Sequence, residues 1–178
     1  MKSKLAAFIF MIISVFILVA CENNTDELDT VKTNRELFIE KYGYDIDCYS
    51  CLVSDELYGV LLQNHIEKWS AENRPISNTT SEMLECEETI AQKWEDEIED
   101  KLNYLKAHIP QDTYTKLQQY VEAAKAFALT ENMLSEDIMR DLEFYGSYSS
   151  VELKQNINDK YRSIAFELSY IQYIYDNN

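Results

Sequence analysis

The residues best suited to chemistry are three cysteines: Cys48 and Cys51, two residues apart, and Cys86 further along the chain. A redox pair of the thioredoxin type requires a βαβ context that the sequence lacks. A zinc site would combine the three thiols with His65, but thiols outside the cytosol oxidise more readily than they bind metal. We therefore expect a structural disulfide from Cys48 or Cys51 to Cys86, with a local bridge between Cys48 and Cys51 as the alternative.

The remaining polar residues give no catalytic pattern. The two histidines, His65 and His108, are each expected to be half-buried helix residues, and no Ser-His-Asp order, phosphate-binding glycine loop or His-Glu-x-x-His motif is present. The tyrosine-rich tail, residues 161–175, is read as core plus rim. A run of carboxylates is read as a solvated helix face rather than a metal or glycosidase cluster: Glu95, Asp96, Glu97, Glu99 and Asp100. We expect no enzymatic activity, no metal and no cofactor.

A fourth cysteine, Cys21, follows a segment with the form of a bacterial lipoprotein signal peptide. Residues 1–4 are basic and residues 5–20 are almost all apolar, which is 16 residues and shorter than the ~20 of a membrane-spanning helix. Cleavage before Cys21 would allow its thiol to carry a diacylglyceryl group and its new amino terminus a further acyl chain such as palmitate. Residues 21–33 are acidic and polar and are predicted to be a flexible tether.

The charge restricts the kind of partner. The whole chain has a formal charge of -16, and without Lys2 and Lys4 of the leader the mature chain has 14 basic against 32 acidic residues, or -18. Such a surface repels phosphates, so nucleic acid is excluded as a partner. A cationic protein is favoured, unless the charge serves only to keep the protein soluble.

The composition predicts an all-α fold, because the chain has only 3 Gly and 2 Pro and its periodic segments are longer than strands. The clearest segment is residues 79–109, which begins with a Thr79/Glu82 capping box and stops at Pro110. Its apolar residues recur at helical spacing and are expected to be buried: Met83, Cys86, Ile90, Trp94, Ile98, Leu102, Leu105 and Ile109.

Further helices are predicted on either side of this segment. A short one ends at Gly43, and another runs from an N-cap at Ser54 to about Ser70. A long helix capped by Asp112 follows Pro110, with a break near residues 130–132 and a C-cap at Gly146. Its stripe is Tyr114, Leu117, Val121, Ala124, Phe127 or Ala128, Leu134, Ile138 and Leu142.

The last helix is predicted to begin at a Ser149/Glu152 capping box, with its own stripe at Leu153, Ile157, Tyr161, Ile164, Leu168, Ile171 and Tyr175. Short connections make neighbouring helices antiparallel. We therefore expect one helical domain, residues 34–178, in which the three long helices form an up-down-up bundle and the earlier helices pack on it.

Part of the chain, about residues 79–175, resembles the LprI-like lysozyme-inhibitor family of small bacterial envelope and secreted proteins. Met83-Leu84-Glu85-Cys86 matches the family's Met-x-x-Cys, and Asp100-Lys101-Leu102-Asn103 with Leu105 partly matches its Asp-x-x-Leu-Asn-x-x-Tyr-x-x-Leu. Phe127 stands at the family's Trp, Gly146-Ser147 at its Gly-Ser, and Arg162 at its final Arg.

The resemblance implies a helical domain that binds and inhibits a cationic lysozyme, an enzyme that cleaves glycan with a pair of carboxylates. The sequence thus predicts a lipoprotein of the cell envelope, outside the cytoplasm and held to a membrane by the lipid on Cys21. The alternative is a structural or interaction lipoprotein without lysozyme activity.

Overall fold

The computed structural model describes residues 31–46, 54–75, 79–146 and 148–177, and these form helices and connections without any strand. The all-α prediction is therefore confirmed. The leader, Cys21, most of the tether, Cys48, Cys51 and Ser147 lie outside the described residues. All the helices belong to one compact unit, Thr33–Asn178, and in chain order they are α2 (Asn34–Tyr42), α3 (Asp55–Leu62), α4 (His65–Asn73), α5 (Thr80–His108), α6 (Gln111–Asp141) and α7 (Ser149–Asn177).

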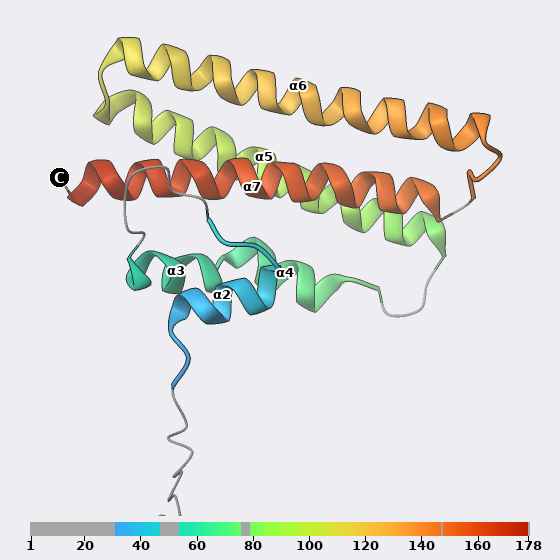
Figure 1. Ribbon diagram of the computed structural model, residues 1–178, viewed down its shortest axis with the longest axis horizontal. Coiled ribbons are helices and arrows are strands. Elements are labelled where there is room, and N and C mark those ends of the chain that lie inside the picture. The colour runs from blue at the N-terminus through green and yellow to red at the C-terminus, as the bar shows by residue number, and fades with distance from the viewer. Residues whose placement is uncertain (1–30, 47–53, 76–78, 147, 178) are drawn as a thin grey trace, which may run out of the picture. The chain divides into compact units, whose positions relative to one another are not determined.

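Helices α5 and α7 form the centre of the bundle, with α6 on one side and α2, α3 and α4 on the other (Figure 1). Helix α5 begins as predicted: the Thr79 side chain accepts from the Glu82 N–H while Glu82 accepts from the Thr79 N–H. Most of its stripe is confirmed, because Ile90, Trp94 and Ile98 are each 2% exposed, whereas Met83 and Leu102 are only half-buried. Helix α7 buries most of its own stripe, Leu153, Ile157, Tyr161, Ile164 and Leu168. Near its end Ile171 is half-buried and Tyr175 is 42% exposed, so the stripe leaves the core there.

Within the bundle, α6 packs mainly along α7 and meets α5 over only a few residues. The most extensive contact is between α5 and α7, and each of these two helices also packs against two others. Burial is greatest on α7, which includes the fully buried Ala165 and Phe166. The segment with the clearest signals in sequence, α5, therefore shares the centre with α7, because packing between helices is a tertiary property that spacing along one helix does not give.

The three short helices enclose an aromatic cluster against α7. Phe38 of α2 is completely buried, and its ring centroid lies 5.2 Å from that of Tyr58 on α3 and 5.8 Å from that of Phe166 on α7. Trp94 of α5 meets the same Phe166 edge to face at 5.7 Å. Edge-to-face contacts of this kind add about 0.5–1.5 kcal/mol to the burial of each ring. This cluster joins the N-terminal helices to the α5–α7 pair.

Helix α2 ends at Gly43, as predicted. The φ of 78° at this position favours glycine, because a residue with a Cβ atom would be strained there. Ser54 caps α3 as expected. The single helix predicted from Ser54 to about Ser70 is wrong, however, because the chain turns at Gln63. Asn64 starts α4 there, its side chain accepting from the N–H groups of Ile66 and Glu67.

Four predictions for α6 and the start of α7 are also wrong. Helix α6 begins directly after Pro110 without a side-chain cap, so Asp112 lies inside its first turn, and it is continuous through residues 130–132. It ends at Leu142, and the residue with positive φ is Glu143, not Gly146. Ser149 is the first residue of α7, and its hydroxyl accepts from the Gly146 N–H.

The largest correction concerns the stripe of α6. In the proximal half, residues 111–126, Tyr114 and Val121 are buried, and Ala128 continues this line. Of the predicted alternatives Phe127 or Ala128, Ala128 is thus the core residue and Phe127 is 63% exposed, and the later predicted positions are solvent-exposed: Leu134 (59%), Ile138 (48%) and Leu142 (59%). We call these four exposed side chains the α6 ridge, and residues 127–141 the distal half of the helix.

Candidate functional site

An acidic groove of about 280 Å³ lies between α5 and the proximal half of α6. Its apolar lining comes from Ile98, Leu102 and Val121. Helical spacing brings the polar lining together, because residues four apart lie on the same side of a helix. On α5 these are Gln92, Asp96, Glu95 and Glu99, and on α6 they are Gln118, Glu122 and Lys125.

The groove carries more negative than positive charge. Lys125 Nζ lies 2.7 Å from Glu95 Oε1, which compensates one of the four carboxylates. Asp96 and Glu122 accept hydrogen bonds only from the neutral amides of Gln92 (2.9 Å) and Gln118 (3.1 Å). Three carboxylates, those of Asp96, Glu99 and Glu122, are therefore left without a cation among the described residues.

The single cation of the groove is held in place from two sides. Besides its ion pair with Glu95, the Lys125 ammonium lies 5.3 Å from the centroid of the Tyr161 ring on α7. Burial raises the pKa of Tyr161, and the nearby Glu95 carboxylate raises it further, so the phenol stays neutral and its ring face is available to the ammonium. Lys125 therefore joins α6 to α5 and α7, and does not neutralise the outer carboxylates.

The groove is chemically suited to receiving Lys or Arg side chains. Apolar atoms at its base can cover the aliphatic stem of such a side chain while the three carboxylates accept from its charged end. It contains no histidine, cysteine or serine. Within the described part of the chain, no group of three or more His, Cys, Asp or Glu side chains is arranged to hold a metal ion.

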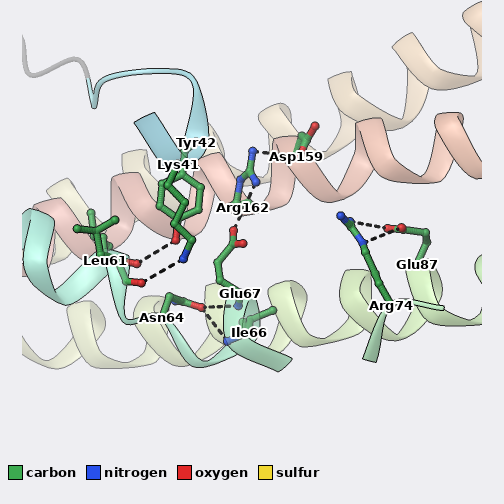
Figure 2. Close-up of polar contacts among 11 residues, drawn as sticks. Lys41, Tyr42, Leu61, Asn64, Ile66, Glu67, Arg74, Glu87, Asp159 and Arg162 are labelled. Carbon is green, nitrogen blue, oxygen red and sulfur yellow. Dashed lines mark hydrogen bonds and ion pairs between the residues drawn. The ribbon is translucent and has the colours of Figure 1, made fainter. Parts of the chain in front are cut away.

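A larger hollow of about 580 Å³ lies between the end of α2, the turn from α3 to α4, and α4 itself, and is lined in part by the cations Lys41, Lys68 and Arg74. In Figure 2 Arg74 points to the Glu87 carboxylate and Lys41 to the end of α3. Lys41 Nζ donates to the Leu62 carbonyl at 3.2 Å, and Lys68 lies 4.0 Å from Glu72. Each lining cation thus already has a partner, so the hollow is not an open anion site.

Arg162 of α7 is the main link between this region and the bundle (Figure 2). Its guanidinium lies 3.4 Å from Glu67 on α4 and 3.0 Å from Asp159, and faces the rings of Tyr42 and Tyr44 at 5.5 and 5.8 Å. Burial lowers the pKa of Arg162, but the carboxylates of Asp159 and Glu67 outweigh the effect of burial, so that the pKa of Arg162 is raised overall. Burial also raises the pKa of Tyr44, with Arg162 acting against it.

A buried carboxylate, Glu87, joins α4, α5 and α7 and was not predicted. Glu87 is 3% exposed and lies 3.3 Å from Arg74, and it also accepts from Asn158 (2.7 Å) and Gln155 (3.0 Å) of α7. A buried charge needs this number of partners to offset its desolvation. The sequence signal is weak, since Glu87 and Asn158 only adjoin the stripe residues Cys86 and Ile157.

The positions that carry the family resemblance do not form one site. Met83, Leu102 and Asn103 all lie on α5. The side chains of Met83 and Leu102 are half-buried, and that of Asn103 is exposed. Leu102 lines the acidic groove, whereas Phe127 lies on the α6 ridge and Arg162 in the ion-pair cluster. Gly146 is exposed in the α6–α7 connection, and Ser147 is outside the described residues.

Cys86 is buried and forms no disulfide with any residue in the described part of the chain, and its Sγ lies 3.8 Å from the Asn73 carbonyl oxygen. Burial raises its pKa, with the neighbouring Glu87 carboxylate adding to the effect. Because Cys48 and Cys51 lie outside the described residues, a bridge from one of them to Cys86 stays a prediction. Peptide mapping without reduction tests it: a linked pair of peptides that includes Cys86 supports the bridge, and a linked Cys48/Cys51 peptide beside alkylated Cys86 contradicts it.

The histidines are more exposed than predicted. Both His65, at the start of α4, and His108, at the end of α5, are exposed rather than half-buried. The core position next to His65 is taken by Ile66, which is 1% exposed. His108 stacks on Tyr104 with ring centroids 4.0 Å apart, and its Nδ1 lies 2.7 Å from the Tyr104 carbonyl oxygen.

No protein-family model, no curated protein and no solved structure matches this chain. Among the described helices, none is both long enough and apolar enough to cross a membrane.

Proposed function

We propose that this protein is a cell-envelope lipoprotein whose helical domain binds a cationic protein, with a lysozyme as the first candidate partner. The observation that carries the proposal is the acidic groove, where Asp96, Glu99 and Glu122 have no cationic partner and surround an apolar base. Such a groove recognises the Lys and Arg side chains that dominate the surface of a cationic enzyme. The resemblance to the LprI-like family is the reason for choosing lysozyme.

The charge of the whole domain supports the same proposal. A mature chain of charge -18 attracts a cationic partner over about 8–10 Å at physiological salt, which raises the rate of encounter. In this proposal the protein binds and inhibits the enzyme and is not itself an enzyme. Lipid on Cys21 holds the domain at a membrane surface, and residues 21–33 let it reach partners there.

The test uses residues 22–178 without the leader, since the compact unit begins at Thr33. Binding to a cationic lysozyme and inhibition of glycan cleavage are measured at low and moderate salt. The triple variant Asp96→Asn, Glu99→Gln, Glu122→Gln should weaken binding by about tenfold or more, because each lost charged contact is worth on the order of 1 kcal/mol. The Lys125–Glu95 ion pair is left intact in this variant.

A matched control removes three carboxylates from other exposed positions, with Glu56→Gln, Glu85→Gln and Glu152→Gln. Both variants change the net charge equally, so a specific groove predicts a large loss only in the first. Equal small losses would show that only overall charge attracts the enzyme. Absence of lysozyme binding by the unaltered chain would reject lysozyme as partner and leave the alternative, a structural or interaction lipoprotein of the envelope.

The membrane part of the proposal has a separate test. Cys21→Ser should move the protein from the membrane pellet to the soluble fraction, because the serine cannot carry the thioether-linked lipid. Recovery of this variant in the pellet with its leader removed would contradict the lipid tether.

A further inference from the structure

The α6 ridge is an apolar helix face that this fold leaves uncovered. Its four side chains, at positions 127, 134, 138 and 142, lie along one side of the helix at spacings of seven, four and four residues. They are between 48% and 63% exposed and span about 22 Å at the helical rise of 1.5 Å per residue. Apolar surface of this extent along a single helix is typical of a face that another helix covers.

The ridge is exposed because the distal half of α6 turns polar residues toward α7. A hollow of about 320 Å³ separates the two helices there, lined by Ala128, Asn132 and Ser135 of α6 and by Asn156 and Asp159 of α7. An ion pair of 3.2 Å between Lys160 and the Glu131 carboxylate links the two helices across it. Ala128 is buried toward α7, whereas the four larger side chains of the ridge face away from the domain's own core.

The side chains beside the ridge are acidic. Asp137 and Asp141 lie three residues beyond Leu134 and Ile138, which places them on the solvent side of the same helical face. Both are exposed, and neither forms an ion pair with any described residue. Glu143 follows at the end of the helix. A partner that covered the ridge would therefore meet carboxylates along one edge.

We propose that the α6 ridge is a docking surface for a cationic amphipathic helix of a partner protein, whose apolar face covers Phe127, Leu134, Ile138 and Leu142 while its Lys or Arg side chains pair with Asp137 and Asp141. The ridge supplies the anchors of helix-to-helix recognition and the aspartates supply orientation. This surface is separate from the acidic groove, because Phe127 is two residues from the groove's Lys125 and so lies on another side of α6.

A second copy of this chain fits the ridge poorly. The four side chains expose on the order of 400 Å² of apolar surface, against the ~800 Å² per partner of a standard stable interface. Two copies would also bring like charges together, since each carries Asp137 and Asp141 beside the ridge. A short cationic helix needs less area for a transient complex and gains from the charges that oppose self-association.

The experiment measures binding of a synthetic peptide of about 18 residues, long enough to cover the ridge. Leucine and lysine are arranged so that the leucines form one helical face, and a second peptide of the same composition has a scrambled order without such a face. Fluorescence anisotropy with residues 22–178 should give at least about tenfold tighter binding of the amphipathic peptide. Equal affinities for the two peptides, or no binding of either, would overturn the proposal.

The variant Phe127→Ala, Leu134→Ala, Ile138→Ala keeps helix propensity and removes most of the ridge. It should bind the amphipathic peptide about tenfold less tightly than the unaltered chain. The control, Val60→Ala, removes another exposed apolar side chain, 69% exposed on α3, and should not change affinity. Unchanged affinity of the triple variant would assign peptide binding to other surfaces and overturn the proposal.

A second variant, Asp137→Asn with Asp141→Asn, leaves the ridge in place and provides an independent reading. It should weaken peptide binding a few-fold and reduce its dependence on salt. Sedimentation of the unaltered chain tests whether a second copy occupies the ridge instead. A dimer that the triple variant abolishes would show that a second copy covers the ridge, and would overturn the proposal. Lysozyme binding by the groove is measured separately, so its failure does not affect these results.

Discussion

The proximal and distal halves of α6 carry equally regular apolar stripes, yet the buried line of the proximal half extends into the distal half only as far as Ala128. Val121 of the proximal half is 2% exposed, whereas Leu134 of the distal half is 59% exposed. The difference arises on the facing helix. Opposite Lys125, α7 presents Tyr161, and opposite the distal half it presents Asn156, Asp159 and Lys160. A helix buries the side that its neighbour can cover, so the neighbour's sequence decides which half of α6 joins the core.

The same comparison separates two ways of attaching a helix to a domain. The proximal half is attached by apolar contact, with Tyr114 and Val121 in the core, and by the Tyr120 hydroxyl donating to Glu167 at 2.5 Å. The distal half is attached by an exposed ion pair, and a hollow lined mainly by polar residues separates it from α7. Apolar burial contributes on the order of 1.5–3 kcal/mol per large side chain, whereas an exposed ion pair contributes about 0–1 kcal/mol. We expect the two halves to differ accordingly in stability.

The largest effect is expected from Trp94→Ala, which sets the scale for a fully buried position of the α5–α7 core. Removing this side chain, which is 2% exposed and packs against Phe166, should lower the free energy of unfolding by about 3–5 kcal/mol. Denaturant melts measure the loss. A change below about 1 kcal/mol would show that the α5 stripe is not the core.

A direct contrast between the halves comes from Val121→Ala and Phe127→Ala. The first removes a buried side chain and should cost roughly 1–3 kcal/mol. The second removes a larger but exposed one and should change stability by less than about 0.5 kcal/mol. Equal losses in parallel denaturant melts would mean that Phe127 is covered in solution.

Amide hydrogen exchange compares the halves without mutation. Amides of residues 134–141 should exchange at least about tenfold faster than those of residues 118–125, because opening the distal half exposes little apolar surface. Exchange resolved by residue with NMR is the measurement. Uniform protection along α6 would contradict a weakly attached distal half, and added amphipathic peptide should slow only the distal amides.

The smallest effect is expected from Glu131→Gln, which removes the ion pair between the distal half and Lys160. Both side chains are about half exposed, so the loss of stability should be at most about 1 kcal/mol and should shrink as salt is raised. Melts at two salt concentrations check both points. A loss of several kcal/mol that salt does not reduce would show that the pair is buried.

The parts of the fold that were predictable rest on local signals. The capping box of α5 and the C-cap at Gly43 involve residues within one or two turns, so sequence spacing alone indicates them. The break at Gln63 was missed although Asn64 is a strong N-cap residue, because neither Gly nor Pro stands at the turn itself and the stripe from Leu57 to Trp69 reads as continuous.

The candidate sites were less predictable, because they depend on which helices meet. The carboxylates of residues 95–100 are largely a solvated face, as expected, but the position of three of them opposite Gln118 and Glu122 across a groove follows only from the packing of α6 beside α5. Periodicity likewise predicts that α6 has an apolar stripe and does not say how far along the helix a neighbour covers it. The ridge residue Leu134 matches the helical period as well as the buried Val121 does.

The aromatic cluster around Phe38 has a consequence for how the chain folds as it is synthesised. Phe38 packs against Phe166, and the Ser54 hydroxyl donates to the Tyr173 hydroxyl at 2.7 Å across 119 positions of sequence. Helices α2 and α3 therefore cannot complete their core until α7 has been synthesised, since that core includes α7. Contacts of such long range slow folding. A chain cut off before α7 would leave the aromatic residues of α2 and α3 without the partner that buries them, so the stability of these early helices depends on a segment that is synthesised much later.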